Sequence, residues 1–234
     1  ILREDLSNGF SIQKTYDDSN RCNTHQFPDG SQATKTYDAA YLREVTYSGL
    51  AHRYTDYDLS GNLLREALPL NAGVVNYSID SLSRTSAISS PYHSERIGSF
   101  DPIGKVESLH TILPSSSQVR HFSYDTLGQL LEDGEHIYAY DSHYNRLSKN
   151  GLSIEIDDLN QLGSWEYDAD GNPCRKENLT FAYDALDRLI SVELPDHTLI
   201  QYSYDPFHRR LIKTLPDKTI RYLYDGNREI GFEE

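Results

Sequence analysis

One short phrase recurs along the whole chain and limits the folds that the chain can adopt. The phrase is a tyrosine, phenylalanine or isoleucine followed by an aspartate. Successive copies lie 11 to 24 residues apart, and a period of this size indicates a repeat architecture whose units pack on their neighbours. The twelve copies end at Asp17, Asp38, Asp58, Asp80, Asp101, Asp125, Asp141, Asp157, Asp168, Asp184, Asp205 and Asp225. We therefore expect a wall, a spacer or a binding surface rather than one catalytic centre.

The aspartate of each phrase predicts a turn. In four copies a glycine follows three residues later, at Gly61, Gly104, Gly128 and Gly171. Aspartate at the first position and glycine at the fourth are typical of a type I turn, and glycine tolerates the positive φ of a hairpin with a G1 bulge. The aspartate carboxylate can accept hydrogen bonds from backbone N–H groups of its own turn.

Other residues take the glycine position in the remaining copies. Asparagine, aspartate and histidine tolerate the left-handed region, and they stand at Asn20, Asn160, Asp187 and His208. Ser83 fits less well. Tyr41 and Tyr144 break the pattern, which predicts that their turns are shifted or of another type.

Alternating aromatic residues before the turns predict strands. Tyr202 and Tyr204 are one example of rings two residues apart, and such side chains share one face of a strand. Rings on neighbouring strands could stack into ladders. A second strand follows each turn, as at 210–214, and Pro-led turns at 28–30, 195–197 and 216–218 then reverse the chain again. The predicted fold is an all-β array of antiparallel hairpins.

The phrase resembles the YD repeat of the Rhs family, which is related to the YD barrels of teneurins. The match is carried by Tyr57–Leu63, Tyr124–Leu130, Tyr183–Leu189 and Tyr204–Leu211, and it extends from about Tyr16 to Tyr224. The resemblance implies an extended antiparallel sheet that spirals into a hollow shell. In insecticidal toxin complexes and polymorphic toxins such shells enclose a C-terminal toxic domain, whereas teneurin barrels serve cell adhesion. The family's terminal plug with its self-cleavage signature is not in this sequence.

Composition limits the partners of the chain. The formal net charge is −14, which disfavours nucleic-acid binding, and no apolar run is long enough to span a bilayer. Methionine is absent, including at position 1, so we expect a piece of a larger protein or a processed product. Residues 1–234 are expected to form a single array of about eleven repeats, with 1–15 as the end of a preceding repeat that turns at Asn8-Gly9.

Patterns for metal binding are weak. The segment Asp168–Asn172 has closely spaced carboxylates and a glycine, as calcium loops do, but it is interpreted as one more repeat turn. The nine histidines form no zinc motif. Cys22 and Cys174 are expected to be small buried apolar side chains rather than a disulfide, because distant units of a repeat array rarely touch.

Patterns for catalysis are equally weak. Ser11 and Lys14 fit a Ser-x-x-Lys spacing that is common by chance, and no nucleophile elbow or phosphate loop is present. We therefore expect no catalytic, cofactor-binding or metal-binding residues, and no enzyme activity. Trp165 and exposed tyrosines could stack on sugars, although packing within the sheet is the preferred interpretation.

The main hypothesis is a non-catalytic segment of a Rhs/YD-repeat shell that encloses or delivers a toxin or other cargo polypeptide. Its partners would be the rest of its own shell or a partner shell subunit, together with the enclosed cargo, and it would be secreted or lie at the cell surface. The alternative is a carbohydrate- or protein-binding adhesion module that uses rings and open sheet edges. A polysaccharide-acting enzyme on a parallel β-helix is disfavoured, because tight reversals cannot join parallel strands.

Overall fold

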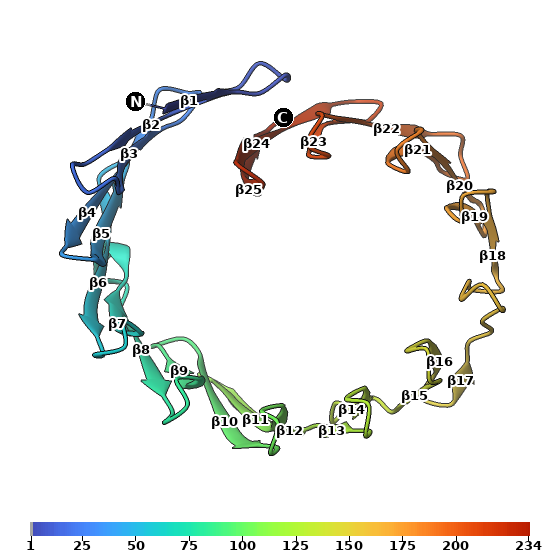
Figure 1. Ribbon diagram of the computed structural model, residues 1–234, viewed down its shortest axis with the longest axis horizontal. Coiled ribbons are helices and arrows are strands. Elements are labelled where there is room, and N and C mark those ends of the chain that lie inside the picture. Colours follow the sequence, from blue (N-terminus) through green and yellow to red (C-terminus); the bar gives the residue numbers. More distant parts are fainter. Residues whose placement is uncertain (1) are drawn as a thin grey trace. The chain divides into compact units, whose positions relative to one another are not determined.

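The computed structural model describes residues 2–234 and shows a succession of antiparallel hairpins (Figure 1). The all-β prediction is confirmed, and a short 3₁₀ turn, η1 (Pro69–Asn71), is the one helical element described within 2–234. The chain divides into two compact units. One comprises Lys14–Ser153, and the other comprises Leu2–Gln13 together with Ile154–Glu234.

In the first unit, strands β3 to β12 belong to one sheet in which they follow one another in chain order and each pairs with the next. Two small sheets, β13–β14 and β15–β16–β17, complete this unit. The strands are β3 (Cys22–Gln26), β4 (Gln32–Asp38), β5 (Tyr41–Tyr47), β6 (Leu50–Tyr57), β7 (Leu63–Ala67), β8 (Val74–Ile79), β9 (Thr85–Ser89), β10 (Ser94–Phe100), β11 (Val106–Leu113), β12 (Ser116–His121), β13 (Ser123–Tyr124), β14 (Leu130–Glu132), β15 (Tyr138–Tyr140), β16 (Arg146–Lys149) and β17 (Leu152–Ser153).

The second unit contains an eight-stranded antiparallel sheet, again in chain order, and the N-terminal strand β1 (Leu2–Asp5). Strand β2 (Ser11–Tyr16) begins in this unit and leads into the first. The sheet strands are β18 (Trp165–Tyr167), β19 (Pro173–Lys176), β20 (Leu179–Tyr183), β21 (Leu189–Glu193), β22 (Leu199–Tyr204), β23 (Arg210–Thr214), β24 (Thr219–Asp225) and β25 (Arg228–Glu233). No helix described within 2–234 is long and apolar enough to cross a membrane.

The predicted aspartate turns are present. At Asp125 the backbone N–H donates to the Gln129 carbonyl, and the Gly128 N–H donates back to the Asp125 carbonyl. Gly128 has φ of +86°, the left-handed conformation that glycine adopts without strain. The β13–β14 register shifts at this turn, which confirms the predicted bulge.

The two tyrosines that break the sequence pattern differ in outcome. Tyr144 has φ of +67° and donates its backbone N–H to the Asp141 carbonyl, so the prediction of a deviating turn was wrong there. The turn accepts tyrosine because its backbone hydrogen bonds fix the left-handed residue whatever its side chain. At Tyr41 the prediction is confirmed, because Asp38 pairs directly with Tyr41 across a tighter loop.

Two of the three Pro-led turns at the other end of the hairpins use the same backbone pattern, whereas the third is closed by a bond from Leu215 N–H to the Lys218 carbonyl. Phe27 N–H donates to the Ser31 carbonyl and Gly30 N–H to the Phe27 carbonyl, and Leu194 and His197 repeat this arrangement. The predicted Asn8-Gly9 turn belongs to this series: Leu6 N–H donates to the Phe10 carbonyl, and Gly9 N–H donates to the Leu6 carbonyl. We call residues 6–10 the N-terminal turn.

The most extensive packing lies in the second unit, where the N-terminal turn contacts β23 and β24. Leu6, Leu211, Tyr222 and Tyr224 form a buried cluster, and Phe10 packs against it. The other buried apolar residues are aliphatic, as at Ile12 and Val192, and most rings are only half-buried. A one-layer sheet leaves its faces too open to bury large rings fully.

Candidate functional site

The repeated aspartate turns form the most regular constellation of polar groups in the molecule. Asp58 illustrates their chemistry. Its Oδ1 accepts hydrogen bonds from the backbone N–H groups of Ser60 (2.9 Å) and Asn62 (2.8 Å), and its Oδ2 accepts one from Asn62 Nδ2 (2.8 Å). The carboxylate is therefore occupied in holding its own turn closed, as the sequence predicted.

At five of the turns, the residue four positions after the aspartate connects the turn to the following one. Arg188 Nε donates to Asp184 Oδ2 (2.7 Å), and its Nη1 donates to the Asp205 carbonyl (3.0 Å). Gln129 does the same with its amide, which donates to the Asp141 carbonyl (3.1 Å). Further links of this kind join Arg21 to Ala39, Asn172 to Asp187 and Arg209 to Gly226.

The tyrosine of the phrase makes the reverse connection. Tyr204 donates its hydroxyl to the Leu189 carbonyl (2.8 Å), which lies just after the preceding aspartate turn. The same bond joins Tyr37 to Cys22, Tyr57 to Leu42, Tyr124 to Val106 and Tyr224 to Arg210. The pairs at Asp58, Asp125 and Asp205 therefore have two tasks: the aspartate closes its own turn, and the tyrosine holds the turn before it. We call the forward and backward bonds together the turn clamp.

Cations lie over the rings of the turn clamp. The Arg188 guanidinium carbon is 5.1 Å from the centre of the Tyr204 ring, and Arg84 is 3.7 Å from that of Phe100. Such contacts are attractive because the ring face is electron-rich. The expectation that rings of successive units stack on one another in ladders was therefore mostly wrong, although Tyr41 and Tyr57 do stack at 4.7 Å. Elsewhere an arginine lies over rings of two successive units, as Arg210 does over Tyr202 (5.6 Å) and Tyr222 (4.6 Å).

Hydrogen bonding at the turns shifts the pKa values of the groups involved. The side-chain bond from Arg188 lowers the pKa of Asp184 to about 2. The hydroxyl of Tyr138 lowers the pKa of Asp133 to about 2. Burial, followed by a hydrogen bond to Glu66, raises the pKa of Tyr77 to about 12. These groups keep their charge states through neutral pH and offer no proton for general acid–base chemistry there.

Replacing Tyr57 by phenylalanine tests the backward bond of the turn clamp. The change removes the hydroxyl that donates to the Leu42 carbonyl at 2.7 Å and leaves the ring in place. We expect the free energy of unfolding to fall by about 1 kcal/mol in urea denaturation. Tyr144 is 63% exposed and is the control, because Tyr144→Phe should change stability by less than about 0.5 kcal/mol. Equal effects in the two variants would contradict the assigned role.

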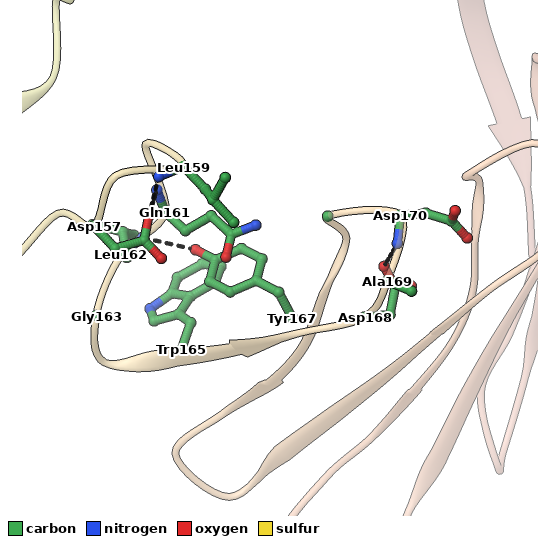
Figure 2. Close-up of a pocket in the computed structure, with 11 residues that line it drawn as sticks. Asp157, Leu159, Gln161, Leu162, Gly163, Trp165, Tyr167, Asp168, Ala169 and Asp170 are labelled. Carbon is green, nitrogen blue, oxygen red and sulfur yellow. Dashed lines mark hydrogen bonds between the residues drawn. The ribbon is translucent and has the colours of Figure 1, made fainter.

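An open hollow of about 680 Å³ lies in the second unit between the turns at Asp157 and Asp168. Figure 2 shows the rings of Trp165 and Tyr167 beside the loop that carries Leu159 and Leu162. The Tyr167 hydroxyl accepts a hydrogen bond from Leu162 N–H (3.0 Å), and Lys176 lies 4.9 Å from the Trp165 ring centre. Internal contacts thus engage both rings, and sugar stacking on Trp165 stays a prediction.

The calcium-like segment behaves as a repeat turn. Asp168 Oδ1 accepts the backbone N–H groups of Asp170 (3.0 Å) and Asn172 (2.8 Å), and Asp168 lies on the rim of the hollow (Figure 2). Among residues 2–234 no three His, Cys, Asp or Glu side chains come together as a metal ion would require.

The two cysteines are separate from one another, as expected. Cys22 and Cys174 are free thiols. Both are half-buried, rather than buried as had been expected. Ser11 and Lys14 both lie in strand β2.

The N-terminal turn adds a second polar constellation at β23 and β24. Asn8 is 8% exposed, and its Nδ2 donates to the carbonyls of Leu211 (3.3 Å) and Tyr222 (2.8 Å). Glu4 accepts a hydrogen bond from Arg209 Nη1 (2.6 Å), which also brings the N-terminal strand onto the Asp205 turn. The side chains of Arg209 and Asp205 are only 9% and 5% exposed. Sequence reasoning did not connect these segments.

Most of the turn clamp also escaped sequence reasoning, although a signal for it exists. The position four residues after the aspartate holds Arg, Lys, Asn or Gln in all but two of the twelve copies, the exceptions being Asp38 and Asp225. These side chains can all donate to a carboxylate and to a backbone carbonyl at once. Their recurrence at a fixed distance from the aspartate could have revealed the link between turns.

The hairpins follow one another in chain order and are joined turn to turn, and the described residues contain no catalytic constellation. This arrangement is that of a structural repeat protein. A family model described as the teneurin YD-shell matches residues 76–229, well over half of the chain. The chain belongs to this YD-shell family, and the resemblance drawn from the Tyr-Asp phrase is confirmed.

Relatives agree with this assignment. The curated relatives include tRNA nuclease WapA of Bacillus subtilis, 34% identical over 124 residues, and tRNA3(Ser)-specific nuclease WapA of Bacillus spizizenii, 33% identical over 124 residues. Each match covers 44% of this chain and 5% of the relative, so the chain corresponds to a small part of either protein. Among solved structures, a chain of the Tc holotoxin pore of Photorhabdus luminescens has the same fold, with a TM-score of 0.79 at 18% identity. That match covers 96% of this chain and 14% of the other.

Proposed function

We propose that this chain is a non-catalytic wall segment of a YD-repeat shell that encloses a cargo polypeptide. The turn clamp carries the proposal, because at three junctions it joins one hairpin to the next in both directions, through Arg21 and Tyr37, Arg188 and Tyr204, and Arg209 and Tyr224. Tyr204 and Arg188 make these bonds at 2.8 Å and 3.0 Å between the same two turns. Bonds of this kind resist bending between hairpins, and stiffness is what a containing wall requires.

The charges of the chain suit containment better than catalysis. Asp58, Asp125 and Asp184 direct their carboxylates to backbone N–H groups of their own turns, so they act as structural acceptors rather than as acids or bases. The partners in this proposal are adjoining segments of the same shell or a partner shell subunit, and the cargo inside it. The complete protein would be secreted or would lie at the cell surface.

Limited proteolysis of the complete natural protein tests the proposal. If the shell encloses cargo, mass spectrometry should find a segment that resists protease while the wall is intact. Asp58→Ala removes the acceptor of three turn hydrogen bonds and should make that segment accessible. Leu59 is fully exposed in the same turn, and Leu59→Ser is the control that should leave the segment protected. Uniform cleavage of the unmodified protein would overturn enclosure and favour the adhesion alternative.

A further inference from the structure

The contact made by the N-terminal turn indicates a general docking site of the sheet. Leu211 of β23 has no partner in the pairing with β22, because Ser203 pairs with Ile212 and the next residue, Tyr204, pairs with Arg210. A skipped residue forms a bulge, and bulges re-aim their side chains. Leu211 is 2% exposed because Leu6 and Phe10 of the N-terminal turn pack on this region.

The hydrogen bonds of this contact are equally specific. The β23–β24 ladder runs from Thr214 and Thr219 to Ile212 and Arg221. Asn8 donates its two amide hydrogens to the carbonyls of Leu211 and Tyr222, which come directly after that ladder. An asparagine amide thus continues the pairing where the two strands separate.

The same features recur one unit earlier in the sheet, without the N-terminal turn. Ile190 is the bulge residue of β21, because Ala182 pairs with Ser191 and Tyr183 with Leu189. The β21–β22 ladder ends at Ser191 and Gln201, so Ile190 and Tyr202 occupy the places that Leu211 and Tyr222 occupy in the next unit.

The bulge residues of the two units differ in the exposed fraction of their side chains. Ile190 is 37% exposed, whereas Leu211 is 2% exposed. The bulge residue on the other side, Ile230 of β25, is 36% exposed, and its register skip lies between Leu223–Gly231 and Tyr224–Glu229. Of three successive apolar bulge residues, only the one under the N-terminal turn is covered. Covering an exposed isoleucine would contribute favourably to docking, since apolar burial stabilises contacts.

We propose that Ile190 and Tyr202 form a docking site for a hairpin turn from another stretch of YD-repeat strip. The occupant is a turn with the chemistry of the N-terminal turn: apolar residues on both sides and an asparagine that donates to the carbonyls of Ile190 and Tyr202. The site continues an interface that already exists at Leu211 and Tyr222. The proposal rests on the proposed shell function, because in a shell the turns of one strip would lie against the sheet of another.

A hairpin peptide tests the site. The probe is residues 2–13 of this chain, cyclised through a terminal cross-link because an isolated hairpin is marginally stable. Added to the full chain at up to about 1 mM, a range that detects weak binding, it should slow hydrogen exchange in β21 and β22. Ile190→Asp should weaken binding at least about tenfold, since it replaces the apolar contact by a charge. Leu186→Asp is the control in the same hairpin, where the side chain is 59% exposed at the turn tip, and should leave binding unchanged.

Three results would overturn the proposal. One is protection confined to β23 and β24, which would mean that the peptide only exchanges with the N-terminal turn. Another is binding that Ile190→Asp and an Asn8→Ala peptide both leave intact. The third is no binding at all. None of these results depends on whether the complete protein encloses cargo, so the docking site can fail while the shell function stands.

Discussion

Asp205→Ala should lower the free energy of unfolding of the second unit by about 3 kcal/mol, the loss typical when one partner of a buried ion pair is removed. Asp205 accepts the backbone N–H groups of Phe207 and Arg209, and Arg209 Nε donates to its Oδ2 at 2.6 Å. Burial by itself would raise the pKa of Asp205, but the bonds from Arg209 hold it below the usual value. The carboxylate is therefore charged at neutral pH, and its loss leaves the buried Arg209 Nε without its acceptor.

The matched control is Asp125→Ala. Asp125 holds the same type of turn through the N–H groups of Leu127 and Gln129, without the covering N-terminal strand. We expect a loss of about 1 kcal/mol, because water can reach the groups left behind. Hydrogen exchange resolved along the sequence, at increasing urea concentration, measures each effect in its own unit. If the two variants lost equal stability, burial of the Arg209–Asp205 pair would add nothing to the free energy of unfolding.

Leu211→Ala should lower the stability of the second unit by about 3 kcal/mol, as is usual for a large-to-small change in a packed cluster. Leu211 is 2% exposed and lies in the buried cluster with Leu6, Tyr222 and Tyr224. The cavity would also loosen the N-terminal turn. The Leu6 amide, which is bonded to the Phe10 carbonyl, should therefore exchange hydrogen faster in the variant.

Ile190→Ala is the control for Leu211→Ala, because Ile190 is the bulge residue of the preceding unit and is 37% exposed. Its truncation removes contacts that are already partly solvated, so the loss should stay below about 1 kcal/mol in the isolated chain. Both changes are measured by denaturation together with exchange at Leu6. A loss at Leu211 no greater than at Ile190, with unchanged exchange at Leu6, would show that the N-terminal turn does not stabilise the unit.

Local chemistry made the hairpin fold predictable. Asp125 and Gly128 place a turn by backbone geometry alone, and alternating residues such as Tyr202 and Tyr204 place a strand. The turn at Tyr144 was mispredicted because side-chain preference was given more weight than the hydrogen bonds that close the turn. Tyrosine disfavours the left-handed conformation only weakly compared with the hydrogen bonds that close the turn. It therefore adopts this conformation where the rest of the unit fixes the backbone.

The contacts between turns were less accessible to sequence reasoning. Arg188 bonds to a turn that begins 17 residues later, and the donor type recurs at that position, so a pattern search could have found it. Asn8 bonds to Tyr222 across 214 residues, and no periodic signal connects an asparagine in one turn with two carbonyls of distant strands. Backbone carbonyls carry no sequence identity, so contacts to them need coordinates.

The turn clamp also has a consequence for how the length of such a protein can change in evolution. Tyr204 and Arg188 each bond only to the adjacent turn. The bonds of a hairpin therefore depend on its neighbour and not on its position along the chain. Whole hairpins could be duplicated or lost while every remaining junction keeps its donors and acceptors. The opposite loops differ in length, as where Asn150-Gly151 takes the place of a Pro-led reversal. Gene duplication could therefore adjust the size of the assembly in steps of one hairpin without redesign of any joint.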